Sequence, residues 1–130
     1  MARPSWDTYF LWIARIVSSR STCPRAEVGA VLTRDKRIIA TGYNGSLSGE
    51  PHCLDVGCLL DKGGRHCQRA IHAETNAIAQ AARLGIPVDG ATLYYWDSRS
   101  RPADSCNKCW QLMMAAGIRR VVGVNYEFER

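Results

Sequence analysis

The segment Ile71-His72-Ala73-Glu74-Thr75-Asn76-Ala77-Ile78 lies in the middle of the chain, and Cys106-Asn107-Lys108-Cys109 lies in its C-terminal part. The alanine-rich run 72–84 predicts a helix, and so does 106–116, because each run is followed directly by a glycine. The apolar run 91–96 predicts a strand between the two helices. Each polar segment therefore opens a helix.

The regions around these two segments complete a predicted order of elements. Apolar residues recur at helical spacing over 5–19, with serine at the N-cap position. Residues 28–32 and 37–42 are expected to form a hairpin, and 118–125 the last strand. The order helix, hairpin, helix, strand, helix, strand predicts a three-layer α/β/α sandwich in one domain, residues 1–130.

The two helix starts bring together residues with metal chemistry. Cys106 and Cys109 are one helical turn apart, so their sulfurs face one point, and His72 supplies a nitrogen at the start of the other helix. Three protein ligands leave a fourth tetrahedral position open, as catalytic zinc sites do. Glu74 cannot point the same way as His72, and is therefore predicted to move protons as a general acid and base.

The combination is far more specific than its parts. A lone C-x-x-C or a lone histidine is weak, because solvated or capping roles are common. H-x-E followed by C-x-x-C is the pattern of zinc deaminases, in which an activated water attacks the amine-bearing carbon of a base. The sequence therefore predicts a zinc-dependent hydrolytic deaminase.

Composition limits the classes of partner and compartment. The apolar stretch 9–17 contains Arg15 and is too short for a membrane span, and no signal-type apolar core follows Met1. Without a secretion signal the chain is expected inside the cell, where disulfides are rare. Its six cysteines in 130 residues therefore indicate metal binding rather than disulfides. We expect a soluble, cytoplasmic protein. The net charge of +5 is dispersed, so charge alone does not choose between a small anionic substrate and a polymer.

Beyond these residues, the chain resembles the deoxycytidylate (dCMP) deaminase family of the cytidine deaminase superfamily over almost its whole length. The resemblance rests on stretches on both sides of the helix starts: Ser21-Thr22-Cys23-Pro24-Arg25, Val28-Gly29-Ala30-Val31, Ala40-Thr41-Gly42-Tyr43-Asn44-Gly45, Pro51-His52-Cys53, Val56-Gly57-Cys58, Ile71-His72-Ala73-Glu74, Asn76-Ala77-Ile78, Gly90-Ala91-Thr92-Leu93-Tyr94 and Ala116-Gly117-Ile118.

The resemblance implies a fold, a reaction and substrate contacts. The fold is a mixed β-sheet flanked by helices, commonly assembled into homo-oligomers (hexamers), and the reaction converts dCMP to dUMP and ammonia. Asn44 would touch the sugar, and its G-Y-N-G segment is linked to control by dCTP and dTTP with Mg²⁺. Arg25 is a candidate for the phosphate, because a guanidinium matches phosphate geometry, although a solvated charge is an equal alternative. Ala73 and Ser105 are further candidate substrate contacts.

The remaining four cysteines fit a second, structural zinc ion, which some members of the family carry. Cys23, Cys53, Cys58 and Cys67 would form a closed site that orders the long loop between residues 44 and 69. A histidine, His66 or His52, is an alternative to one of the cysteines. The competing interpretation is buried free thiols.

The chain departs from the family in the segment before the catalytic cysteines. Ser105 replaces the usual proline, and residues 95–104 are longer than the family's short turn, so we expect an altered or lid-covered pocket with Arg99 or Arg101 as phosphate ligands. A solvated loop is the alternative. Among the tryptophans, Trp96 is expected nearest the pocket. The chain also ends soon after its fourth predicted strand, which predicts a sheet shorter by one strand than the family's.

Other functions remain open at this level. One alternative is deamination of a modified nucleotide or another aminated base, and a second is a nucleic-acid cytidine or adenosine deaminase. The lack of a basic, aromatic-interleaved stripe disfavours a nucleic-acid partner. The third alternative is a non-catalytic zinc-binding module, which would have no use for Glu74.

Overall fold

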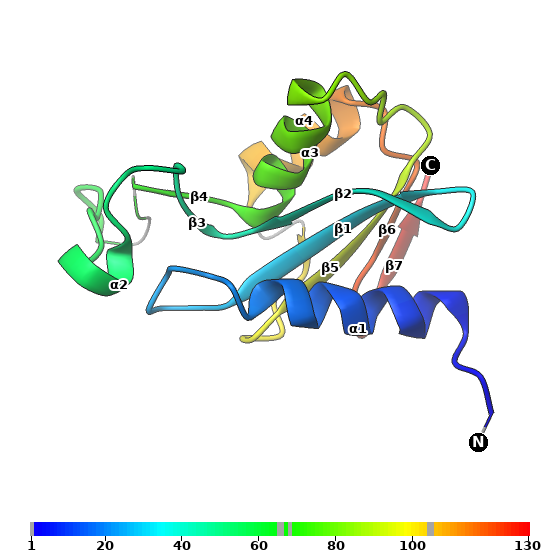
Figure 1. Ribbon diagram of the computed structural model, residues 1–130, viewed down its shortest axis with the longest axis horizontal. Helices are drawn as coiled ribbons and strands as arrows, with labels where there is room; N and C mark the ends of the chain where they lie inside the picture. The colour runs from blue at the N-terminus through cyan, green and yellow to red at the C-terminus, as the bar shows by residue number, and fades with distance from the viewer. Residues whose placement is uncertain (1, 65–66, 68, 104–105) are drawn as a thin grey trace.

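The computed structural model describes residues 2–64, 67, 69–103 and 106–130. One mixed sheet of five strands lies at its centre, in the order β2-β1-β5-β6-β7 (Figure 1). The strands are β1 (Val28–Arg34), β2 (Arg37–Tyr43), β5 (Thr92–Asp97), β6 (Arg120–Val122) and β7 (Glu127–Glu129). Only β5 and β6 pair in parallel, and the other three neighbouring pairs are antiparallel.

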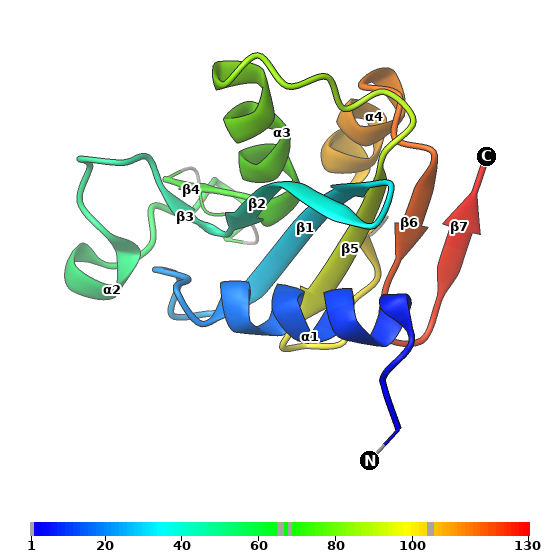
Figure 2. The ribbon, with the colours of Figure 1, turned by 45° about the vertical axis from the view of Figure 1, so that its right-hand side comes forward.

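Helices cover both faces of the sheet, which confirms the three-layer sandwich. Helix α1 (Trp6–Ser18) packs on one face against β1 and β5, whereas α3 (Ala73–Arg83) packs on the opposite face against β2 and β1. Helix α4 (Asn107–Ala115) lies beside α3 (Figure 2). The N-termini of α3 and α4 therefore open on the same side of the sheet, near the end of β5.

The alternation of strand side chains divides the core into two layers. Leu93 and Tyr95 of β5 are buried on the α3 and α4 side, and Tyr94 is buried against α1. By the same alternation, Asp97 at the end of β5 faces the α3 side.

A polar network attaches α1 to the sheet. Ser5 caps the helix by accepting a hydrogen bond from the Thr8 N–H, as predicted. The two terminal nitrogens of the Arg120 guanidinium, Nη1 and Nη2, donate to the Asp7 carboxylate at 2.9 and 2.6 Å. The Tyr94 hydroxyl donates to the same carboxylate at 2.7 Å. The hydrogen bond from Arg120 is the main cause that lowers the pKa of Asp7.

The C-terminal part differs from the sequence prediction. The last predicted strand, 118–125, is shorter than predicted: β6 ends at Val122, and the chain then turns and returns as β7, antiparallel to β6. The Gly123 N–H donates to the Tyr126 carbonyl and closes this turn. The prediction of a sheet with only four strands was therefore wrong. The polar and apolar alternation of Glu127-Phe128-Glu129 is too short to be recognised as a strand from the sequence.

The long segment after β2 contains short elements that were not predicted. Strand β3 (Gly45–Ser46) pairs with β4 (Ala70–Ile71), and α2 (Cys53–Val56) lies between them. The pairing returns the chain to the start of α3.

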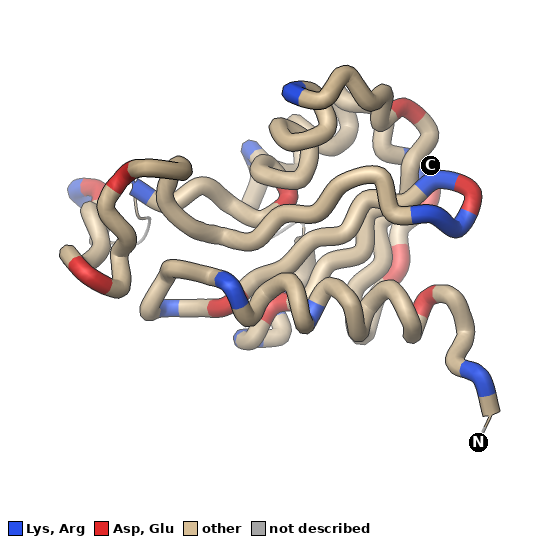
Figure 3. The backbone as a smooth tube through the Cα atoms, viewed as in Figure 1, with Lys and Arg blue, Asp and Glu red and all other residues tan. Residues whose placement is uncertain are grey.

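In the described part of the chain, no helix has the length and apolar character to cross a membrane. Positions of basic and acidic residues occur along many elements of the backbone in Figure 3, without a continuous run of basic positions in that view.

Two glycines allow helices α3 and α1 to approach the sheet closely, because a side chain at either position would collide with helix backbone. A Cβ added at Gly42 of β2 would lie 2.4 Å from the Ala73 carbonyl oxygen of α3, and one at Gly29 of β1 would lie 2.0 Å from the Ala14 carbonyl oxygen of α1. We expect Gly42→Ala and Gly29→Ala each to lower the free energy of unfolding by about 2 kcal/mol, because backbone must move to make room.

Chemical denaturation measures this loss. Gly63→Ala is the matched control, since among the described residues its added Cβ would meet nothing closer than the Asp61 carboxylate at 3.7 Å. The control should change stability by no more than about 0.5 kcal/mol. Equal stability of all three variants would show that helix and strand do not pack as closely as described.

Candidate active site

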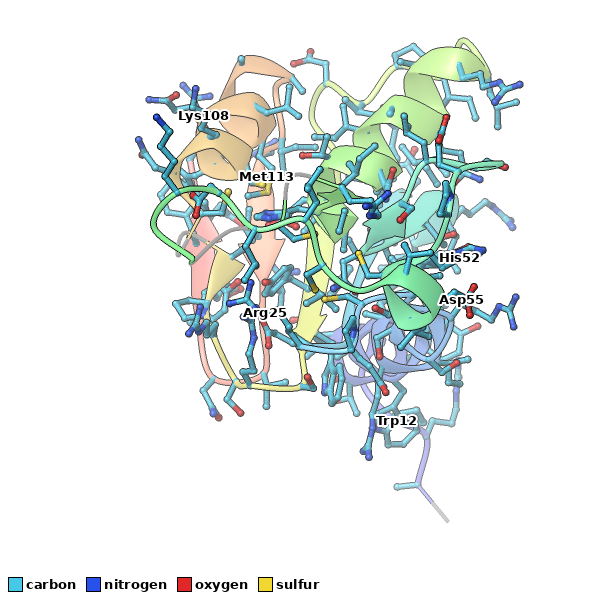
Figure 4. All side chains as sticks on the ribbon, turned by 90° about the vertical axis from the view of Figure 1, so that its left-hand side faces the viewer. Trp12, Arg25, His52, Asp55, Lys108 and Met113 are labelled. Atoms are coloured by element: carbon cyan, nitrogen blue, oxygen red, sulfur yellow. The ribbon has the colours of Figure 1, made fainter. Side chains whose placement is uncertain are left out.

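A cavity of about 450 Å³ opens at the N-termini of α3 and α4, beside the end of β5. The sequence-predicted residues on its wall come from four separate segments of the chain: Arg25, Asn44, His72, Ala73, Glu74 and Cys106. Figure 4 looks toward this side of the molecule, with Arg25 between Lys108 of α4 and the α2 residues His52 and Asp55 in the view. Folding therefore brings together the candidate metal, proton-transfer and substrate residues.

One nitrogen and two sulfurs converge at one side of the cavity. Nδ1 of His72 lies 3.0 Å from Sγ of Cys109, which lies 2.9 Å from Sγ of Cys106. His72 is the N-cap of α3, and Cys106 is the N-cap of α4, so each helix begins one residue later than predicted. At a cap position the side chain is not yet wound into the helix, so both ligand atoms turn toward the space between the two helices.

The two sulfurs have different surroundings. The Cys106 sulfur accepts a hydrogen bond from the Cys109 N–H at 3.3 Å in the first turn of α4. Burial raises the pKa of the Cys109 thiol, and the Glu74 charge raises it further. A bound cation would reverse this cost, because metal ligation deprotonates cysteine.

The donor set is selective for the type of metal. The three ligand atoms lie within 4.8 Å of one another, and two sulfurs with one imidazole nitrogen suit Zn²⁺ rather than the oxygen-seeking Mg²⁺ or Ca²⁺. Three such ligands also leave room for a fourth. These residues fit a catalytic zinc ion.

Glu74 lies in the first turn of α3, with only 2% of its surface exposed. Burial raises the pKa of its carboxyl group to about 7, and the nearby Asp97 charge acts in the same direction. A carboxyl group with that pKa can both accept and release a proton near neutral pH. This property is what a general acid and base requires.

Asn44 has a structural task at the cavity wall. Its Oδ1 accepts from the Val28 N–H and its Nδ2 donates to the Ala26 carbonyl, both at 2.9 Å, so that the end of β2 is tied to the start of β1. One N–H of an amide group that makes these two bonds is left for a further acceptor. Arg25 is exposed at the same wall. Ser105 lies outside the described residues.

The segment after Tyr95 contains features that the sequence did not reveal. Strand β5 continues through Asp97, whose register partner is Val28 of β1, and a turn then carries Arg99 and Arg101 to the cavity. Trp96 was expected near the pocket, and that prediction was wrong. It packs on the α1 side, where the Arg15 guanidinium lies 5.3 Å from its ring centre. Because alternate residues of a strand face opposite sides of the sheet, alternation from Tyr95 would have predicted that Trp96 faces α1 and that Asp97 faces α3.

A second group of sulfurs lies in the loop region. Cys53, Cys58 and Cys67 have ligand atoms within 4.8 Å of one another, with Cys53 and Cys67 sulfurs 3.6 Å apart. Burial opposes ionisation of Cys67, but backbone N–H groups of residues 59, 69 and 70 lower its pKa to about 7. Cys23, the fourth predicted ligand, is not part of this group and instead lines the cavity.

Only one of the two histidine alternatives for the second group, His52, lies within the described residues. His52 is the exposed N-cap of α2 and does not belong to the group of three sulfurs. His66 lies outside the described residues. The three cysteines thus converge as predicted, whereas the fourth ligand is not identified among the residues described.

Comparison with known proteins gives relatives along nearly the whole chain. The chain is 46% identical over 121 residues to ComE operon protein 2 of Bacillus subtilis, which covers 93% of this chain and 60% of that protein. It is 39% identical over 132 residues to the deoxycytidylate deaminase of Mycobacterium phage D29, covering 94% of this chain and 96% of that enzyme. This chain thus spans less than two thirds of the Bacillus protein but nearly all of the phage enzyme.

Solved structures and family models agree with this picture. The crystal structure of the dCMP deaminase from cyanophage S-TIM5 in complex with dCMP and dUMP superposes with a TM-score of 0.74 at 26% identity, covering 95% of this chain and 83% of that one. Residues 4–125 match the model of the cytidine and deoxycytidylate deaminase zinc-binding region. With this match and the convergence of His72, Cys106 and Cys109 beside Glu74, the chain belongs to the cytidine and deoxycytidylate deaminase family.

Proposed function

We propose that this protein is a zinc-dependent deaminase that converts dCMP to dUMP and ammonia. The observation that carries the proposal is the placement of three zinc-type ligands and a buried carboxyl group at one cavity. The names of the phage and yeast relatives, deoxycytidylate deaminases that are 39% and 37% identical to this chain, support the choice of substrate.

His72, through Nδ1, and the two sulfurs of Cys106 and Cys109 would hold the metal ion. When bound, zinc supplies a Lewis acid that makes water acidic near pH 7. The two helix N-termini hold the ligand atoms before any ion binds, so that little reorganisation of the backbone is required.

Glu74 handles the protons of the reaction. Its carboxylate takes one proton from the attacking water and delivers it to the ring nitrogen, and then takes the remaining proton of that same oxygen and delivers it to the departing amine, which leaves as ammonia while the C=O of the product forms. Burial keeps this carboxyl group away from bulk water, and its pKa of about 7 makes both directions of transfer accessible at neutral pH. Neighbouring Asp97 does not compete for this role, because its own carboxylate is held by other groups.

Substrate binding follows from the polar groups around the cavity. Asn44 would donate its remaining N–H to the sugar, and Arg25 would attract the phosphate across the open side. Ala73, completely buried at the start of α3, would contribute backbone to the wall beside the base. The volume of about 450 Å³ is within the range of small-ligand pockets.

Cys53, Cys58 and Cys67 would bind a second, structural zinc ion, with the fourth ligand from Cys23 or one of the two histidines proposed above. Support comes from the converged sulfurs and from the backbone N–H groups that stabilise a thiolate at Cys67. Such an ion would order the segment that separates β3 from β4.

The protein would act in the cytoplasm as a homo-oligomer. Six free cysteines fit a reducing compartment. Tyr9, Trp12 and Ile16 form an exposed apolar stripe on α1, the type of surface that subunit contacts cover. Control by dCTP or dTTP with Mg²⁺, and a hexameric state, remain predictions from the family resemblance.

Ammonia release from a panel of nucleotides tests the function. With zinc-loaded protein we expect the highest kcat/KM for dCMP, and at least about tenfold lower values for deoxycytidine, since loss of a charged group's hydrogen bonds costs on the order of 1.5 kcal/mol or more. The panel should also contain CMP, 5-methyl-dCMP, dCTP and short cytosine oligonucleotides. Preference for 5-methyl-dCMP or an oligonucleotide would replace the proposed substrate.

Replacement of the carboxyl group tests the mechanism. Glu74→Gln should lower kcat by about a thousandfold, because proton transfer by a positioned residue contributes on this order. Zinc content, measured by elemental analysis, should not change. Glu50→Gln, at an exposed loop position, is the control and should keep full activity. Activity retained in Glu74→Gln would refute the assigned role.

Metal analysis also tests the second site. We expect two zinc ions per chain in the native protein and one in Cys53→Ser, with a free energy of unfolding lower by several kcal/mol because metal binding is coupled to folding. Leu54→Ala, an exposed position on the same helix, should keep both ions. A native content of one zinc ion, or two ions in Cys53→Ser, would contradict a structural zinc site.

A further inference from the structure

We propose that Asp97 and Arg99 form a clamp that selects the 5′-phosphate of the substrate, with Asp97 as the positioning residue and Arg99 as the phosphate ligand. The proposal rests on the proposed function, because it assumes a nucleoside monophosphate in the cavity. It assigns a role to the segment after Tyr95, which departs in length from the usual short turn.

The carboxylate of Asp97 is fully enclosed by protein. Its side chain has 0% exposure, and the Tyr95 hydroxyl donates to Oδ2 at 3.1 Å. Arg99 supplies three further donors: its backbone N–H at 2.7 Å and Nε at 3.1 Å to Oδ1, and Nη2 at 2.9 Å to Oδ2. A buried carboxylate needs such partners, so the position of Arg99 is strongly constrained.

The turn itself is held from its other side. The Ser98 N–H donates to the Glu27 carbonyl at 2.9 Å, and the Glu27 N–H donates back to the Ser98 hydroxyl at 3.0 Å. The Ser100 N–H donates to the Asp97 carbonyl at 2.9 Å, and Ser100 adopts a φ of 59°. Backbone and side chain therefore fix the guanidinium before any ligand arrives.

The fixed guanidinium keeps donors for a ligand. Asp97 uses one edge of the Arg99 fork, Nε and Nη2, and Nη1 has no hydrogen-bond partner within the described part of the chain. The side chain is 38% exposed and lines the cavity, whereas Asp97 does not reach the cavity wall. A guanidinium held in this way presents its remaining donors with little loss of side-chain entropy.

Charge around the cavity favours an anion at this side. Three arginines line it (Arg25, Arg99 and Arg101), and the only acidic residue among the described lining residues is Glu74. The Asp97 charge is neutralised at short range by Arg99, so the pair does not repel a phosphate as a free carboxylate would. Arg25 and Arg101 attract the phosphate by their charge, and Arg99 fixes the orientation of the phosphate by hydrogen bonds.

A purely structural role for the pair makes a different prediction. If Arg99 served only to neutralise Asp97, its loss would lower stability and all activities together. Contact with the phosphate instead requires a loss confined to the binding of phosphorylated ligands, which raises KM and leaves kcat unchanged.

The experiment uses the zinc-loaded, full chain and four variants. Arg99→Met removes the ligand but leaves a buried, unpaired carboxylate. Asp97→Asn with Arg99→Met removes both charges and avoids that cost. Asp97→Asn alone tests positioning. Arg37→Met, an exposed arginine on β2 that is not among the residues lining the cavity, is the control. The readouts are KM and kcat for dCMP, and the Kd values of dUMP and inorganic phosphate from calorimetry.

We expect the double variant to raise KM for dCMP and Kd for dUMP by about tenfold, as loss of a hydrogen bond to a charged group does. Its kcat should stay within about twofold of the native value, and its Kd for phosphate should rise in parallel. Asp97→Asn should raise the same constants, and should have no such effect once Arg99 is gone, because it acts through that residue.

Two outcomes would overturn the clamp. The first is that the double variant binds dUMP and phosphate with native affinity. The second is that the double variant loses about tenfold in kcat while its KM for dCMP does not change. Failure of the proposed function is distinguishable from both. A native protein that deaminates no cytosine nucleotide would refute the function, whereas weaker dUMP and phosphate binding in the double variant would still support the clamp. Absence of any dUMP or phosphate binding in the native protein would refute the clamp as well.

Discussion

The convergence of one imidazole nitrogen and two sulfurs at two helix N-termini is the constraint on which the rest of the structure depends. His72 and Cys106 are both cap residues, so their side chains are directed by the chain's entry into α3 and α4 rather than by the helices themselves. The sheet must hold the two helix starts within hydrogen-bonding distance of each other. The close contact of α3 with β2 and of α3 with α4 meets that requirement.

The sheet meets this requirement by unusually close packing. At Gly42 the backbone of β2 touches the first turns of α3, so the height of His72 and Glu74 above the sheet is set by the absence of a side chain. On the opposite face, Gly29 plays the same part for α1, and the Asp7–Arg120 pair ties that helix to β6. The site is thus supported from both sides of a thin sheet.

Two carboxyl groups on the α3 side of the sheet, those of Glu74 and Asp97, have different electrostatic surroundings. Burial raises the pKa of Glu74 to about 7, which leaves it able to exchange protons. Asp97 is also buried, and its carboxylate accepts four hydrogen bonds, three of them from Arg99. Two chemically equivalent groups therefore have different tasks because their neighbours differ.

Much of this protein could be read from its sequence. Helical spacing, capping residues and strand runs predicted the layers, and the spacing H-x-E with C-x-x-C predicted the candidate metal ligands and the candidate proton carrier, because those patterns depend on local geometry. The position of Asp97, the side of the sheet that Trp96 occupies, the return of β7 and the convergence of the Cys53, Cys58 and Cys67 sulfurs were decided only in the tertiary structure. Each depends on contacts between residues far apart along the chain, where one residue of strand register, or one turn in a loop, reverses the direction of a side chain.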